Sequence, residues 1–263
     1  TCSGRMSYEG KPAYSKMAKA SPKGALGMQK ADAAIAAKLD AAFISGQTAA
    51  KAPAMGVAIA STDGWLWHKS SGDNKKLFHW ASVGKSFTAL AIIQMVEEGK
   101  LAFGDNIAKW FPHLPNAEYI TVEDLLRHTS GLYSANEDPE WRANGKSPMK
   151  AAQEDAILIK HGAMFCPGQH WRYSNSGYTL LGRIIEAVDQ KSYKTAINDR
   201  IISVLGLTET IIVDAENKST VVSPVTQKTE QPMDVTAPGP AGGIAASPSD
   251  MVRFWAAFFE GRI

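Results

Sequence analysis

The feature that most constrains the fold is a stretch of the chain that is apolar on every side of a helix. Between Ser82 and Glu98 the large apolar residues recur without a polar stripe, and Gly99 with Lys100 supplies a helix end. A surface helix keeps one polar face, whereas a helix that is apolar all round lies in the interior of a protein. The sequence therefore predicts a central helix whose first turn carries Ser82 and Lys85.

Ser82 and Lys85 form an S-x-x-K spacing, which places both side chains on one face of a helix. A serine hydroxyl is a weak nucleophile until a base takes its proton. The helix N-terminus and a low dielectric both disfavour a charged Lys85, which lowers its pKa toward the range of a working base. The alternative is an N-cap serine with a snorkelling lysine. The same spacing recurs at Ser147-Pro-Met-Lys150, where the proline and the polar surroundings predict a plain helix N-cap.

A second candidate element is Tyr173-Ser-Asn175, which has the pattern Y-x-N. In an extended loop, residues i and i+2 point the same way, so a phenol and an amide would face one cleft together. The phenol can relay a proton when a neighbouring cation lowers its pKa. The amide can hold a substrate carbonyl or the lysine. A structural turn is the alternative interpretation of these residues.

The order of the predicted elements favours an α+β fold. Helical periodicity over residues 29–44 ends at Gly46, and Asp63-Gly64 joins two strands into a β-hairpin. Further helices are predicted over residues 176–188 and from the Ser247 N-cap to the chain end. We expect three parts: a flexible arm over residues 1–27, an α/β part over 28–79 with 240–263, and a helical part over 80–239.

Composition excludes several classes of function. The chain has 263 residues, a formal net charge of +2 and no concentrated Lys/Arg block, so a nucleic-acid partner is not expected. No apolar stretch reaches the roughly 18 residues that a membrane span needs. No His/Cys spacing suggests a metal site, and no G-x-S-x-G elbow suggests an α/β-hydrolase triad.

The two cysteines are too few for a disulfide framework. Cys2 resembles the lipidated cysteine of a bacterial lipoprotein, with a chain boundary that happens to include a cysteine as the alternative. Cys166, next to Pro167, is interpreted as a buried or half-buried small hydrophobic residue. A periplasmic or cell-envelope location is therefore expected, with the cytoplasm as the alternative. The sequence predicts no oligomeric state.

Several segments together resemble the β-lactamase-related serine hydrolases, which include class C β-lactamases, penicillin-binding proteins and family VIII carboxylesterases. The resemblance covers roughly Met55 to the end, in family order. It rests on these segments: Phe78-His-Trp-Ala-Ser-Val-Gly-Lys-Ser-Phe-Thr-Ala89, the H-T-S-G-L segment 128–132, the tyrosine motif 167–182, Leu205-Gly-Leu-Thr-Glu-Thr210 and the glycine loop from Ala241.

The resemblance implies a β-lactamase/transpeptidase-like fold, with an antiparallel sheet flanked by helices plus a helical domain. It implies catalytic roles for Ser82, Lys85 and Tyr173, substrate contact by Asn175 and no cofactor. Tyr133, just after the H-T-S-G-L segment, is a candidate for the acyl pocket. The expected function is a two-step hydrolase that acylates Ser82 with a small ester or amide. A β-lactamase or D-alanyl carboxypeptidase is the first alternative, and a non-catalytic homologue that binds peptidoglycan or protein is the second.

One family element has no counterpart in this sequence. The family carries K-T-G or H-x-G on a late strand beside the nucleophile, but here Lys228-Thr229 is followed by Glu230. We therefore expect that the C-terminal strands of the sheet, and the second oxyanion-hole N–H, are missing from residues 1–263. Loss of one such donor costs about 10²–10³ in rate.

Overall fold

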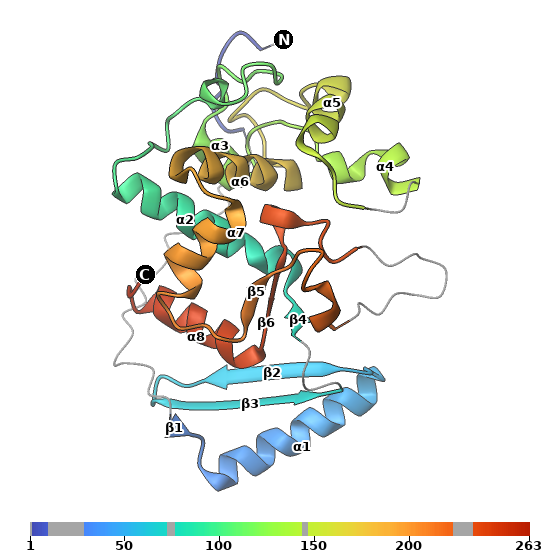
Figure 1. The fold of residues 1–263 in the computed structure, drawn as a ribbon, viewed down its shortest axis with the longest axis vertical. Coiled ribbons are helices and arrows are strands. Elements are labelled where there is room, and N and C mark those ends of the chain that lie inside the picture. Colours follow the sequence, from blue (N-terminus) through green and yellow to red (C-terminus); the bar gives the residue numbers. More distant parts are fainter. Residues whose placement is uncertain (1, 10–28, 73–76, 144–146, 223–233) are drawn as a thin grey trace.

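The computed structural model describes residues 2–9, 29–72, 77–143, 147–222 and 234–263. Its lower layer is a three-stranded sheet of order β1-β3-β2, with β1 at Gln29–Lys30, β2 at Met55–Ala60 and β3 at Trp65–Ser71. β2 and β3 form the predicted antiparallel hairpin, and β1 pairs parallel to β3. Helix α1, at Ala33–Ala50, covers one face of this sheet, and the last helix, α8 at Pro248–Phe259, lies on its other side (Figure 1).

A second small sheet connects this layer to the helices above it. Its order is β4-β6-β5, with β4 at Phe78–His79, β5 at Thr210–Ile212 and β6 at Ile244–Ala246, all antiparallel. α8, at Pro248–Phe259, follows β6 directly, and its N-cap Ser247 accepts from the backbone N–H of Asp250, as the sequence predicts. Strands of two or three residues carry no periodicity, so the sequence did not reveal this sheet.

The helical part occupies the upper half of the molecule (Figure 1). Its core is α2, the predicted central helix, in which Phe87, Ile92 and Met95 are fully buried. Phe87 stacks on Phe254 of α8, with 4.1 Å between ring centroids, which joins the upper half to the lower. The α-helices of this half are α2 Lys85–Glu97, α3 Val122–Arg127, α4 Pro139–Ala143, α5 Ala151–His161, α6 Asn175–Asp189 and α7 Tyr193–Ile197.

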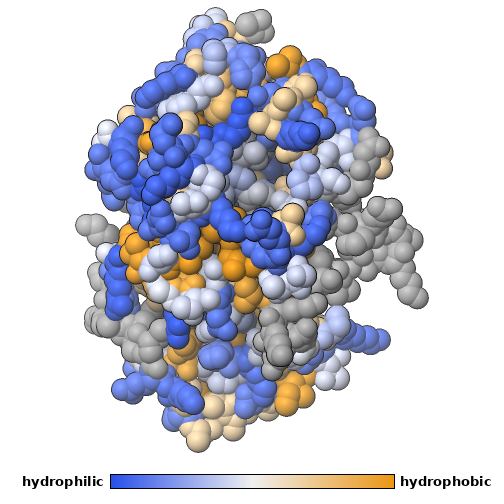
Figure 2. Space-filling view, viewed as in Figure 1, coloured by the Kyte–Doolittle hydropathy of each residue, from blue (hydrophilic) through white to orange (hydrophobic). Residues whose placement is uncertain are grey.

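The surface follows the same division (Figure 2). The upper, helical half is mainly hydrophilic, whereas apolar residues gather over the middle of the molecule. At the end of α8, Phe258 and Phe259 remain exposed beside Trp255. No helix among the described residues combines the length and the apolar content of a membrane span.

Two predicted helix boundaries were wrong. α1 continues through Gly46 to Ala50 and ends where Lys51 takes a left-handed conformation. One glycine costs a helix only about 1 kcal/mol, which does not end it. Ser147 is not the N-cap of α5, because that helix begins at Ala151 after Lys150. Thr121 and Asp124 form a capping box at the start of α3.

The N-terminal segment differs most from expectation. Residues 2–9 are tied to the helical part: Arg5 forms an ion pair with the buried Asp124, and the Met6 N–H donates to the Pro167 carbonyl. Cys2 and Cys166 form a disulfide. Cys166 is half-buried, as expected, but its sulfur is bonded to Cys2, so the interpretation of Cys166 as simply a small hydrophobic residue is wrong. A Cys2 sulfur in a disulfide carries no lipid. Residues 10–28 of the expected arm lie outside the described residues, and so does Lys228-Thr229-Glu230.

Candidate active site

Ser82 lies in a 3-10 turn, Ala81–Gly84, that leads directly into α2. Ala81 has a φ of 45°, a left-handed conformation that costs an L-residue about 1–2 kcal/mol. Strain of this kind persists where the surrounding structure imposes it, and it gathers at functional sites. The glycine loop packs directly against this turn, because a Cβ on Gly242 would lie 2.7 Å from the Ala81 carbonyl oxygen. The Ser82 side chain is exposed, while Lys85 is buried.

The Lys85 amine has three hydrogen-bond partners. Its Nζ lies 3.2 Å from Ser82 Oγ and 2.7 Å from Asn175 Oδ1, and it also donates to the Ala241 carbonyl. Burial lowers the pKa of Lys85 to about 8, because desolvation disfavours the ammonium form. The Asn175 and Ala241 oxygens can only accept hydrogen bonds, so they bind two protons of the amine whether Lys85 is charged or neutral. The remaining position on Nζ faces Ser82 Oγ. That position holds a proton when Lys85 is charged and a lone pair when Lys85 is neutral.

Tyr173 completes the contacts on the serine. Its hydroxyl donates to Ser82 Oγ at 2.7 Å, and its ring lies 4.8 Å from Lys85 Nζ. The preceding Arg172 N–H donates to the His128 carbonyl, and the following Ser174 N–H donates to His128 Nδ1 at 3.2 Å. Ser174 is extended, so Tyr173 and Asn175 both face Lys85, as the Y-x-N spacing predicts.

His128 is a neutral neighbour of this group. Burial, together with the charge of Lys85, lowers the pKa of His128 to about 4. Its Nδ1 accepts the Ser174 N–H, so the ring proton of the neutral form is on Nε2. The ring packs 4.5 Å from that of Tyr173. His128 therefore holds the tyrosine loop without adding charge near Ser82.

Asn136 is a member of the network that the sequence analysis missed. Its Oδ1 accepts from Asn175 Nδ2 at 3.0 Å and from Ser134 Oγ at 2.7 Å. These bonds fix the Asn175 amide so that its oxygen faces Lys85. The signal that could have found it is a second amide close to the H-T-S-G-L segment. The Ala241 carbonyl was also missed, because a backbone acceptor leaves no side-chain pattern.

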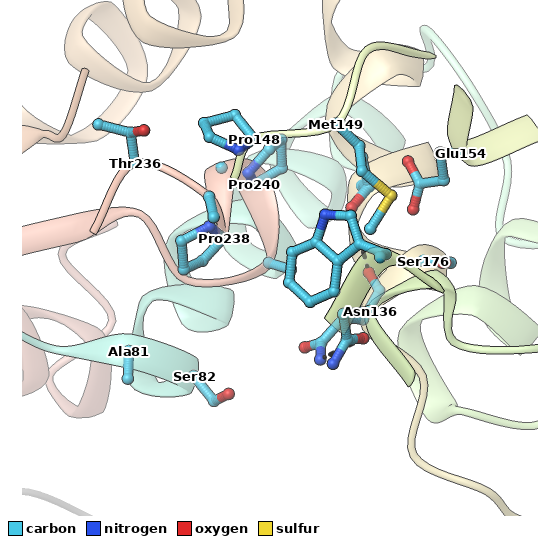
Figure 3. A pocket seen from close by; sticks show the side chains of 16 residues that line it. Ala81, Ser82, Asn136, Pro148, Met149, Glu154, Ser176, Thr236, Pro238 and Pro240 are labelled. Atoms are coloured by element: carbon cyan, nitrogen blue, oxygen red, sulfur yellow. Dashed lines mark hydrogen bonds between the residues drawn. The ribbon is translucent and has the colours of Figure 1, made fainter. Parts of the chain in front are cut away.

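A cavity of about 240 Å³ opens beside Ser82. Figure 3 shows Ala81 and Ser82 at one side of it, and Met149 and Glu154 at the other. The lining residues are Ala81, Ser82, Asn136, Trp141, Pro148, Met149, Glu154, Asn175, Ser176, Thr179 and residues 236–241. Glu154 was not predicted, because it belongs to no motif of the sequence.

Three other residues of the sequence analysis lie apart from this group. Tyr133 does not line the cavity: its ring stacks on His161 at 3.9 Å between centroids, so the structure gives no support to its place in an acyl pocket. Ser147 and Lys150 are both exposed before α5, with no comparable network. The structure thus separates the two S-x-x-K sequences by burial and by partners.

Comparison with known proteins identifies the family that the sequence motifs resemble. Residues 35–262 match the family model described as Beta-lactamase. Penicillin-binding protein 4* of Bacillus subtilis is 35% identical over 174 residues, which cover 59% of this chain and 37% of that protein. This chain thus spans less than half the length of that curated relative.

Two solved structures are also similar. The D-stereospecific amidohydrolase from Streptomyces sp. has a TM-score of 0.67 at 28% identity, over 80% of this chain and 69% of that chain. The D-amino acid amidase from Ochrobactrum anthropi SV3 has a TM-score of 0.73 at 26% identity, over 83% and 68%. The β-lactamase/transpeptidase-like α+β fold expected from the sequence is confirmed, and the chain belongs to the Beta-lactamase family.

Proposed function

We propose that this protein is a serine hydrolase that forms an acyl-enzyme on Ser82 and cleaves a small ester or amide. The observation that carries the proposal is the double contact on Ser82 Oγ, from Lys85 Nζ at 3.2 Å and from Tyr173 OH at 2.7 Å. Covalent acyl transfer requires a nucleophile, a group that takes the proton of the nucleophile and a group that gives a proton to the leaving group.

The proton path follows from these contacts. With Lys85 neutral, its lone pair accepts the Ser82 proton as Oγ attacks the carbonyl carbon of the substrate. Asn175 and the Ala241 carbonyl keep the amine aimed at Oγ, because they bind its other two protons. Tyr173 delivers its proton to the leaving group, and the Lys85 ammonium then returns a proton to the Tyr173 phenolate, so both groups end in the state in which they began. In the second step a water molecule attacks the acyl carbon and the same pair takes its proton. That proton passes to Ser82 Oγ as the bond between the acyl carbon and Oγ breaks. Lys85 and Tyr173 therefore act as a coupled pair.

The developing oxyanion needs hydrogen-bond donors. The first N–H groups of a helix have no intrahelical partner, so the backbone N–H of Ser82 is the donor that this chain supplies. The second donor of the family lies on the late strand, whose motif was not found in residues 1–263.

Similarity to two amide-cleaving enzymes supports an amide or ester as the substrate. Similarity to a penicillin-binding protein supports β-lactams or D-alanyl peptides as the second candidate. A non-catalytic binding homologue stays the third interpretation, and the contacts on Ser82 favour catalysis over it.

The experiment is a hydrolysis panel with p-nitrophenyl butyrate, D-alanine p-nitroanilide and nitrocefin. We expect turnover of the ester or the anilide, and its loss in Ser82→Ala. Ser147→Ala is the matched control, because it removes the exposed serine of the second S-x-x-K sequence. Equal activity in wild type and Ser82→Ala would contradict the proposal. Turnover of nitrocefin alone would select the second candidate.

The disulfide supports a periplasmic or cell-envelope location. Disulfides persist in oxidising compartments and are rare in the reducing cytosol. We therefore propose that the protein works outside the cytoplasm. Fractionation of cells that produce the protein from its own gene is the test, and recovery in the cytosol would contradict it.

A further inference from the structure

The cavity beside Ser82 holds a buried acid that the proposed mechanism does not use. Glu154 lies in the first turn of α5, and only 5% of its surface is exposed. Figure 3 shows it across the cavity from Ser82 and next to Met149. The hydroxyls of Ser176 and Thr179, both on α6, lie beside its carboxyl group and favour the charged form. A group bound in the cavity and attached to Ser82 would therefore extend toward this acid.

No cation neutralises Glu154 within the part of the chain that the structure describes. The nearest candidate is Arg183, one turn beyond Thr179 on α6, and it attracts the Glu154 carboxylate. Its guanidinium, however, is engaged with Asp155, at 2.6 and 3.1 Å, and it packs over the ring of Phe111. Asp155 itself repels a charge on Glu154. No described Lys, Arg or His lies within 4.0 Å of the Glu154 carboxyl oxygens.

A buried carboxylate without a cation is costly, because burial removes its hydration. Burial is also the main cause that raises the pKa of Glu154 to about 7. Groups of this kind in a cavity are candidates for function rather than stability. A bound cation would remove the cost and supply the missing charge.

The other walls limit what kind of molecule fits. Trp141, Met149 and Pro238 present apolar surface, and none of the other lining side chains is charged. Drug-sized ligands fill pockets of about 300–1,000 Å³, so a cavity of about 240 Å³ suits a smaller group. An aromatic wall also favours a cation, because ammonium groups are attracted to the face of an indole ring.

We propose that Glu154 is a specificity residue that binds the ammonium group of a substrate whose acyl carbon is attacked by Ser82. The substrate class is an ester or amide of a small amino acid with a free amine. This inference rests on the proposed acyl-enzyme function. Glu154 takes no part in the proton transfers, and it acts by holding the acyl part of the substrate in the cavity.

The test compares p-nitroanilides of glycine, β-alanine and D- and L-alanine with their N-acetyl counterparts. Wild type should prefer the free amines, and the best chain length reports the distance from Ser82 to Glu154. In Glu154→Gln the ratio of kcat/KM for the free amine to kcat/KM for its N-acetyl counterpart should fall about 10- to 100-fold. This factor corresponds to the loss of one hydrogen bond to a charged group. The kcat/KM of the N-acetyl substrates should change less than about threefold, because glutamine keeps the contacts to Ser176 and Thr179.

Glu140→Gln is the matched control, since it removes the same charge from an exposed side chain on α4 and should leave the preference intact. Two outcomes would overturn the inference: a wild-type enzyme without preference for free amines, or an equal loss on both substrate sets in Glu154→Gln. The second outcome would assign Glu154 to the packing of α5 on α6.

Labelling of Ser82 by a fluorophosphonate separates this inference from the proposed function. A labelled enzyme that cleaves neutral esters but ignores the amine contradicts only the role of Glu154. An enzyme that is not labelled contradicts the acyl-enzyme function itself, and with it the inference.

Discussion

The pH dependence of acylation is a direct consequence of the burial of Lys85. Only the neutral amine can take the Ser82 proton, and burial places the pKa of Lys85 at about 8. The neutral fraction is then about 1% at pH 6, half at pH 8 and about 90% at pH 9. For a neutral ester, kcat/KM should rise about tenfold per pH unit below about pH 7 and less steeply toward pH 8. It should reach a plateau near pH 9 and span about 90-fold between pH 6 and pH 9.

The assay is the initial rate of p-nitrophenyl butyrate hydrolysis from pH 6 to pH 9.5, at substrate concentrations below KM. The pKa of His128 is lowered to about 4, so that group stays neutral throughout. Glu154 titrates near pH 7, so the profile should be repeated in Glu154→Gln, where the break near pH 8 should remain. A flat profile, or a rate that still rises tenfold per unit at pH 9.5, would refute the reasoning.

The lowered pKa of Lys85 also predicts how the folding stability changes with pH. The pKa of Lys85 is lower in the folded chain than in the unfolded one, so the unfolded chain binds more protons between about pH 8 and 10.5. Folding stability from this group therefore rises with pH across that window, by about 3 kcal/mol in total. Lys85→Met should lack this rise, which paired denaturant titrations at pH 7 and pH 9.5 would measure.

Three further predictions concern residues around the site. Gly182→Ala should lower the free energy of unfolding by about 1–3 kcal/mol, because the new Cβ would lie 2.2 Å from Pro240 Cγ. It should also reduce kcat, because Pro240 belongs to the loop that presents the Ala241 carbonyl to Lys85. An unchanged melting temperature and kcat would contradict this. Reduction of the Cys2–Cys166 disulfide should lower the unfolding free energy by about 2–5 kcal/mol, seen as an earlier urea midpoint that Cys2→Ser reproduces without reductant. Phe87→Ala should cost about 3–5 kcal/mol, because that ring is fully buried against Phe254, and a loss below 1 kcal/mol in urea unfolding would count against the packing.

The sequence predicted the residues around the Ser82 hydroxyl better than it predicted the residues that line the cavity. Ser82, Lys85, Tyr173 and Asn175 stand in two short spacings, one helical turn and two steps of an extended loop, that place their side chains on a common face. The resemblance to the β-lactamase-related serine hydrolases then selected the catalytic interpretation over an N-cap and a structural turn. The structure brings these four together. Glu154 could not be found in this way, because its meaning depends on how α5 packs on α6.

The fold shows the same limit. Long elements with clear periodicity, such as α2 and α6, were predicted with nearly correct ends. The sheet of β4, β5 and β6 was missed, because each strand has only two or three residues and depends on partners distant in sequence. The Cys2–Cys166 pairing depends on the path of residues 2–9 across the helical part, which no local pattern encodes. The proposed division into an arm, an α/β part and a helical part stays a prediction.

The central claim is that Ser82 is the nucleophile. The most direct test is to treat the native protein with a fluorophosphonate and to locate the adduct by mass spectrometry of its peptides. We predict one adduct, on Ser82. It should form more slowly in Lys85→Met and should be absent in Ser82→Ala. Ser147 should stay unmodified, although it heads the same S-x-x-K spacing. An adduct on another serine, or none on folded protein, would contradict the account.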